Sequence, residues 1–160
     1  MTKALLSIHV LAAIVLIGPI TAAASLFPRY ARQAAGTGGA PDAGAVAVLR
    51  ALHRICSTYA VLAVAVPVFG VATAVQLDVL GDAWLLTSVA LTLLAAGLLA
   101  AAIVPGQRRV LAALDGHAGG RAAGVAERLP RLAMTTGTFA LIWAVVVVLM
   151  IVRPGSTTGA

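Results

Sequence analysis

Long apolar stretches alternate with polar segments along this chain. Four stretches contain no Asp, Glu, Lys or Arg, and they cover residues 4–27, 55–77, 83–104 and 132–152. An α-helix rises about 1.5 Å per residue, so about 20 apolar residues cross the roughly 30 Å of hydrocarbon in a bilayer. Each stretch is long enough to span a membrane. The pattern therefore predicts four transmembrane helices in a single integral membrane domain over residues 1–160.

The polar segments between these helices differ in charge. Residues 28–54 and 105–131 form two long basic segments, whereas residues 78–82 form a short acidic turn. Cytoplasmic loops carry an excess of Lys and Arg, so we expect both long segments to be cytoplasmic loops and both termini to lie outside. Eight arginines of these segments are expected to contact lipid headgroups: Arg29, Arg32, Arg50, Arg54, Arg108, Arg109, Arg128 and Arg131.

The composition agrees with a membrane protein. Hydrophobic residues make up 61% of the chain and charged residues 10%, whereas an ordinary soluble domain has about 25% charged residues. A soluble domain of this length cannot bury so much apolar surface. The net charge of +6 does not indicate a nucleic-acid partner, because only 4% of residues are aromatic and the basic residues gather between the apolar stretches. The expected partner is the lipid bilayer.

An internal repeat emerges when the chain is shifted against itself by 77 residues. Among the identical residues that the shift brings together are Pro28 on Pro105, Arg32 on Arg109, Leu52 on Leu129, Arg54 on Arg131 and Thr58 on Thr135. It predicts an all-α four-transmembrane-helix bundle built from two tandem, parallel helical hairpins. Convergence between unrelated spans is the alternative. A repeated first helix also argues against reading residues 21–25 as a signal-peptide cleavage site.

Prolines and small residues predict how the helices end, bend and pack. Pro28 and Pro105 follow apolar stretches, where we expect the helices to end or turn, and Pro19 and Pro67 should kink their helices. Small residues four positions apart allow close helix packing in lipid. We expect the following pairs to make contacts within the chain, with homo-oligomers and membrane partner proteins left open: Gly18 with Ala22, Ala96 with Ala100, and Gly97 with Ala101.

His9 is the ionisable residue inside the first apolar stretch, which makes it a candidate functional residue. Ala13, Leu16, Ile20 and Ala23 share its helix face. Such an apolar, partly small face suits haem b, with the imidazole as an axial ligand of the iron. The alternative is a histidine that forms a hydrogen bond with a headgroup or a neighbouring helix.

His53 and Cys56 are weaker candidates for binding a metal ion. They lie three positions apart on one helix, but two ligands do not complete a site. The alternative places His53 with Arg50 and Arg54 in a solvated cluster that contacts lipid phosphates. No pairing of a nucleophile with a base, phosphate-binding loop or pair of carboxylates occurs in the sequence. We therefore predict no catalytic residue.

Four short segments carry a family resemblance: HVLAA at 9–13, GP at 18–19, SLFPRY at 25–30 and LHR at 52–54. Together they resemble a bacterial family of integral membrane proteins of unknown function, which implies the inner (plasma) membrane of a bacterial cell. The chain is more remotely similar to haem-associated membrane protoporphyrinogen oxidases and to copper-resistance membrane domains. In those oxidases a first-helix histidine is followed by a Pro-Arg and then a Lys-Arg pair, and His53 here stands in place of the lysine.

Three functions follow from these observations. The first is a non-enzymatic membrane protein or a subunit of an assembly, which fits the lack of a convergent polar cluster in the sequence. The second is a haem b-binding redox protein that uses His9. The third is a small transporter, which the repeated hairpins suggest.

Overall fold

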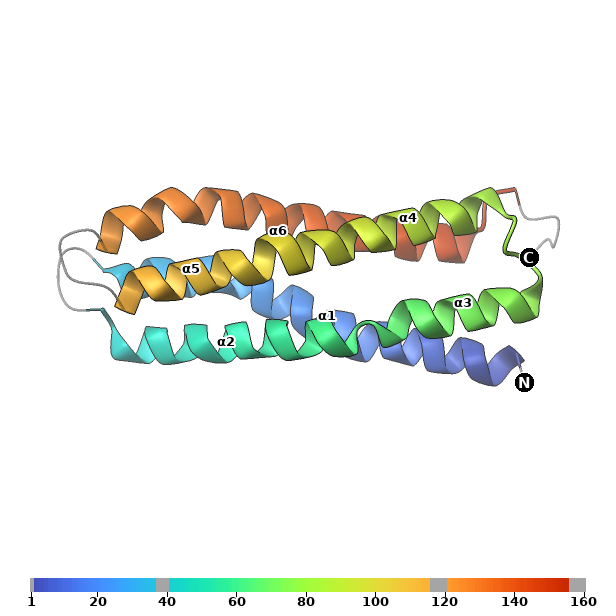
Figure 1. The fold of residues 1–160 in the computed structure, drawn as a ribbon, viewed down its shortest axis with the longest axis horizontal. Helices are drawn as coiled ribbons and strands as arrows, with labels where there is room; N and C mark the ends of the chain where they lie inside the picture. Colours follow the sequence, from blue (N-terminus) through green and yellow to red (C-terminus); the bar gives the residue numbers. More distant parts are fainter. Residues whose placement is uncertain (1, 37–40, 116–120, 156–160) are drawn as a thin grey trace.

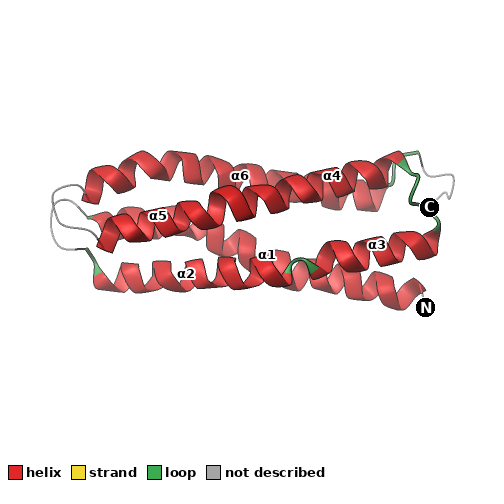
Figure 2. Ribbon diagram, in the orientation of Figure 1, coloured by secondary structure: helices red, strands yellow, loops and turns green. Residues whose placement is uncertain are grey.

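The computed structural model consists of long helices that lie side by side along one axis (Figures 1 and 2). It describes residues 2–36, 41–115 and 121–155. Four of its helical segments are long and apolar enough to cross a membrane, which confirms the predicted all-α bundle. The elements are α1 (Thr2–Ala35), α2 (Ala43–Leu62), α3 (Ala65–Leu77), α4 (Ala83–Leu98), the π-helix η1 (Leu99–Ile103), α5 (Val104–Asp115) and α6 (Arg121–Val152).

The two basic segments that we expected to be long loops are largely helical, so this prediction is wrong. Pro28 lies inside α1, and Pro105 is the second residue of α5, so neither proline ends a helix. A proline removes only one helical hydrogen bond, and the apolar face continues beyond it. Phe27, Ala31 and Ala34, at helical spacing around Pro28, are all fully buried. The bundle therefore extends well past the charge-free stretches.

The larger cluster of buried residues reaches into the end of the bundle formed by these extensions. It includes Phe27 of α1, Leu49 of α2, Val110 of α5 and Val125 of α6, each fully buried. The outer surface is different, because large apolar side chains are exposed on every span. Exposed apolar side chains of this kind are unfavourable in water and favourable in contact with lipid acyl chains. The fold thus supports the four-span membrane protein predicted from the sequence.

Two helix interruptions lie close to prolines. The break between α2 and α3 falls at Ala63, four residues before Pro67, and the Ala63 carbonyl accepts from the Val66 amide at 3.0 Å. Pro67 has no amide hydrogen to donate to that carbonyl. The π-helix η1 likewise ends two residues before Pro105, and π-helical turns are a recognised way to accommodate irregularity in a helix. The irregularity predicted at Pro67 is present as this break four residues earlier, whereas α1 continues as a helix through Pro19.

The opposite end of the bundle is closed by a second, smaller cluster. Trp84 is buried there with Ala74 and Leu85. Its indole Nε1 donates to Asp82 Oδ2 at 2.8 Å, and the Arg153 guanidinium lies 5.5 Å from the ring centre. The start of α1 and the end of α6 lie at this same end (Figure 1). Both helical termini are therefore on the side of the acidic turn.

Candidate functional site

His9 connects α1 to α3 through a hydrogen bond. Its Nδ1 lies 3.0 Å from the Val66 carbonyl oxygen, and the residue is only 8% exposed. A carbonyl oxygen can only accept a hydrogen bond, so Nδ1 carries a proton and donates it to this bond. Of the two roles considered for His9, the structure shows the hydrogen bond to a neighbouring helix.

Gly70 provides the space in which this imidazole lies. A Cβ atom at position 70 would stand 3.0 Å from His9 Cε1 and 3.3 Å from Nδ1. Contacts this short require one of the two groups to move. The absence of a side chain at Gly70 therefore lets α3 approach the ring, and it gives this glycine a packing role that sequence reasoning did not identify.

The surroundings of His9 match one requirement of a haem ligand and not another. A ligating histidine commonly donates Nδ1–H to a backbone carbonyl and binds the metal through Nε2, as the bond to Val66 would permit. However, α3 covers the ring at Gly70, and the small exposed fraction of His9 leaves little of the ring accessible. A haem could reach Nε2 only if α3 moved away from α1. The packing of α3 on the His9 imidazole therefore does not fit a haem bound at Nε2.

A second buried polar group joins three helices. His53 Nδ1 donates to Gln107 Oε1 at 3.1 Å, and Gln107 Nε2 donates to Cys56 Sγ at 3.4 Å. The Cys56 thiol in turn lies 3.9 Å from the Ile20 carbonyl. Gln107 and Cys56 are fully buried. This chain of bonds runs from α2 through α5 and back to α2 and α1, with Gln107 at its centre.

His53 and Cys56, the predicted metal-binding candidates, thus form hydrogen bonds with the side-chain amide of Gln107 and have no further metal ligands beside them among the described residues. Within the described residues, no group of three or more His, Cys, Asp or Glu side chains lies close enough to hold a metal ion. Sequence reasoning missed Gln107, although a signal was available: it follows the buried Ile103 by four positions and precedes the buried Val110 by three. A lone amide in such an apolar register predicts a buried hydrogen-bond partner.

Two other buried polar atoms have no hydrogen-bond partner within the part of the chain that the structure describes. They are Thr136 Oγ1 and Trp143 Nε1, both on α6. The Trp143 ring packs edge-on against Phe139, with ring centres 6.3 Å apart.

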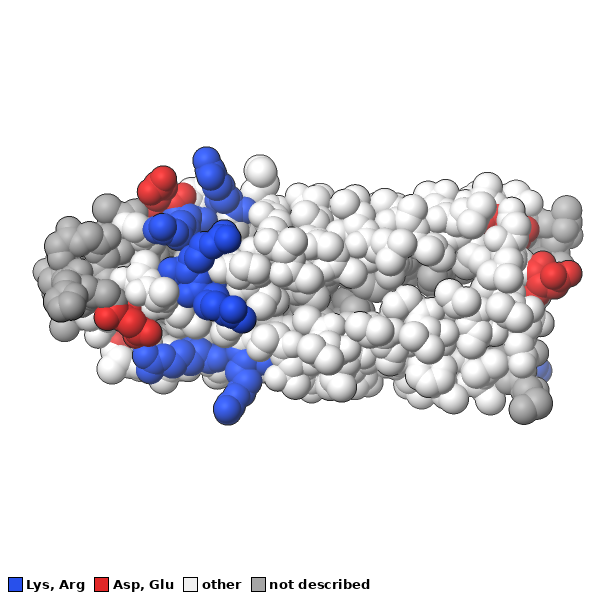
Figure 3. Space-filling view, viewed as in Figure 1, with Lys and Arg blue, Asp and Glu red and all other residues white. Residues whose placement is uncertain are grey.

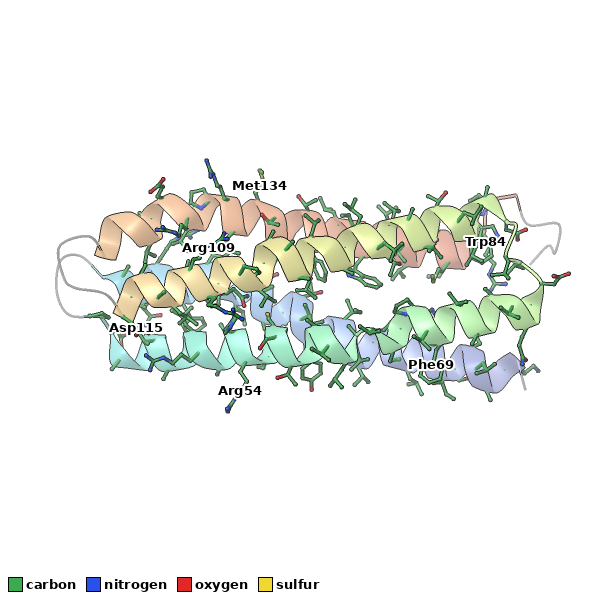
Figure 4. All side chains as sticks on the ribbon, in the orientation of Figure 1. Arg54, Phe69, Trp84, Arg109, Asp115 and Met134 are labelled. Carbon is green, nitrogen blue, oxygen red and sulfur yellow. The ribbon has the colours of Figure 1, made fainter. Side chains whose placement is uncertain are left out.

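All eight arginines proposed for headgroup contact are exposed. Figure 3 shows basic side chains gathered at one level near one end, with uncharged surface between this level and the opposite end. Figure 4 shows Arg54 pointing away from the bundle. Arg50 also forms an ion pair with Asp115 at 2.9 Å, which joins α2 to α5. We call these eight side chains the arginine belt.

Two cavities lie beside α6 at the level of the arginine belt. The larger, of about 430 Å³, lies between the η1–α5 segment and α6, and Arg109, Arg128, Arg131 and Glu127 line it together with apolar residues. The smaller, of about 330 Å³, lies between the end of α1 and α6, with Arg32 as its basic residue. The larger cavity combines a charged end with an apolar one.

The small-residue pairs face outward, so the expectation that they make contacts within the chain is wrong. Gly18 and Ala22 on α1 are exposed. The same holds for the two pairs on the third span, and a Cβ at Gly18 or Gly97 would meet nothing within 4 Å. The buried residues lie at neighbouring helical positions, among them Ile20, Ala24 and Ala95.

The chain matches no protein family model, no curated protein and no solved structure. The family resemblance carried by residues 9–13, 18–19, 25–30 and 52–54 therefore stays a prediction.

Proposed function

We propose that this four-span membrane protein is a non-enzymatic subunit of a membrane assembly. The observation that carries the proposal is the outward-facing small-residue surface of α1, where Gly18 and Ala22 are exposed within an apolar span. Small residues at this spacing allow another helix to approach closely in lipid, where van der Waals packing drives association.

The interior supports the same proposal. The three residues that could have carried chemistry, His9, His53 and Cys56, each form a hydrogen bond with another helix. Buried polar groups that bond across helices stabilise a unique arrangement of spans. Their geometry is that of a scaffold, so the outer surface is where we place the function.

Cross-linking from the α1 surface tests this proposal. Val15 shares a helix face with Gly18 and Ala22 and is 57% exposed. A photo-cross-linking residue at Val15 should give a protein adduct of defined mass in native membranes. The double change Gly18→Leu and Ala22→Leu should reduce that adduct about tenfold, which corresponds to about 1.4 kcal/mol of association free energy. Two differently tagged copies show whether the adduct is a homo-oligomer.

Two control variants make the outcome specific. Ala144→Leu enlarges an exposed small residue on α6 and should leave the adduct unchanged. The same cross-linker at Val148, exposed on α6, should give mainly lipid adducts. If Val15 also yields only lipid adducts, the α1 surface is not an interface and the subunit role is wrong.

The haem hypothesis is the competing function, and a visible spectrum separates the two. The proposal expects no Soret band from protein purified in detergent out of haem-replete cells. A Soret band that disappears in His9→Ala would replace the proposed function with a haem-binding one. It would also require α3 to lie farther from α1 than it does here, because Gly70 packs on the imidazole.

We propose that the protein lies in the bacterial inner membrane. In this orientation the arginine belt is on the cytoplasmic side. The excess of arginine at one end of the spans supports this orientation. In a Cys56→Ala background, Gly81→Cys in the acidic turn should react with an impermeant maleimide on intact cells. Gln33→Cys, exposed at the other end, should react only after lysis. The reverse pattern would invert the topology.

A further inference from the structure

The larger cavity is a groove that runs along the direction of the spans. On one wall, Arg109 follows Ala101 by eight positions, and on the other Glu127 precedes Thr135 by eight, which is about 12 Å of helix in each case. Ala101 belongs to the charge-free stretch of the third span, whereas Arg109 belongs to the arginine belt. The groove therefore passes from the depth of the hydrocarbon to the depth of the headgroups.

The charges at the headgroup end favour an anion. Arg109, Arg128 and Arg131 line the groove against the single carboxylate of Glu127. Arg128 donates to the Gly124 carbonyl of its own helix, so part of its hydrogen-bonding capacity is already used. Guanidinium groups bind phosphate oxygens as a planar fork, which makes Arg109 and Arg131 the principal candidates for binding a phosphate.

The opposite end of the groove is mainly apolar. Ala101, Ala102 and Leu132 line it there, together with Thr135, whose hydroxyl donates to the Arg131 carbonyl of its own helix. Ala101 is exposed. The volume of about 430 Å³ falls within the range of roughly 300–1,000 Å³ typical of ligand sites. An amphiphile with an anionic head and an apolar tail matches both ends, whereas a free anion matches only one.

We infer that this groove binds one phospholipid with an anionic headgroup, whose phosphate lies between Arg109 and Arg131 and whose acyl chain follows Ala101 and Leu132. This site is independent of the proposed subunit role, which concerns α1. It differs from general attraction of the arginine belt to the membrane, since it requires two arginines on adjacent helices and an apolar extension between them.

Native mass spectrometry of the full chain, released from detergent micelles, tests the site. Titration with phosphatidylglycerol should show one retained lipid at concentrations where phosphatidylcholine is lost. Arg131→Gln should weaken retention about fivefold, and Arg131→Lys should weaken it less because the charge remains. Glu127→Gln should strengthen retention, because it removes the carboxylate that faces the phosphate. Ala101→Phe, which fills the apolar end, should weaken it without any change in charge.

The matched control is Arg54→Gln. It removes the same charge from the same belt, but Arg54 lies on α2, points away from the bundle (Figure 4) and does not line the groove. Equal weakening by Arg54→Gln and Arg131→Gln, or equal retention of phosphatidylcholine, would overturn the site. Glycerol phosphate measures the soluble headgroup alone: if it displaces the lipid fully, the groove binds phosphate and not a lipid. Unchanged circular dichroism of each variant excludes misfolding as the cause.

Discussion

Replacing Gly70 with valine is expected to lower the free energy of unfolding by about 2–4 kcal/mol. A Cβ at this position would stand 3.0 Å from His9 Cε1, so the imidazole or α3 must move. The Cβ alone requires a movement of a few tenths of an ångström, and we expect the γ-methyl groups of valine to require more, which would lengthen or break the bond between His9 Nδ1 and the Val66 carbonyl. Equilibrium unfolding of the protein in bicelles measures the effect.

Two further variants separate crowding at His9 from a general intolerance of valine. Gly137→Val is the control, because Gly137 is exposed and a Cβ there would meet nothing within 4 Å. It should change stability by less than about 0.5 kcal/mol. In a His9→Ala background, the cost of Gly70→Val should fall sharply, because the methyl group of alanine leaves room for the new side chain. An equal cost in both backgrounds would contradict the packing role of Gly70.

The four spans could be predicted from the sequence because bilayer thickness sets a length that each charge-free stretch exceeds. The full lengths of the helices could not be predicted in this way. The prediction ended the helices near Pro28 and Pro105, since charge appears there, but arginines on one helix face coexist with buried residues such as Ala31 on another. Amphipathic extensions of membrane helices therefore resemble basic loops when only charge is counted.

The sequence singled out His9 as a polar group within an apolar span, but it did not identify the atom to which His9 bonds. His9 stood out as an ionisable group in an apolar span, and it is indeed buried and bonded to a neighbouring helix. Its acceptor is a backbone carbonyl, which has no sequence signature. The outward orientation of Gly18 was also missed, because spacing shows which residues share a face and not which way that face points.

Gln107→Ala is expected to lower the free energy of unfolding by about 2–4 kcal/mol. The side chain is fully buried, so its removal leaves a cavity among α1, α2 and α5. It also leaves His53 Nδ1 without its acceptor and removes the donor to Cys56. Gln107→Met keeps much of the volume without the polar atoms, so it should cost less than alanine. Gln33→Ala, at an exposed position at the same end of the bundle, should cost almost nothing.

A double-mutant cycle between His53 and Gln107 separates the free energy contributed by their hydrogen bond from the cost of the cavity. If Gln107 stabilises the protein mainly by accepting from His53, the two alanine substitutions together should cost clearly less than the sum of each alone. Interhelical hydrogen bonds in membrane proteins average about 0.6 kcal/mol and reach about 1.7 kcal/mol, so the coupling should fall in that range. Strict additivity would mean that the bond from His53 contributes nothing, so that Gln107 stabilises the protein by filling space and by its contact with Cys56. The buried chain from His53 to Ile20 would then be a consequence of packing and not a cause of it.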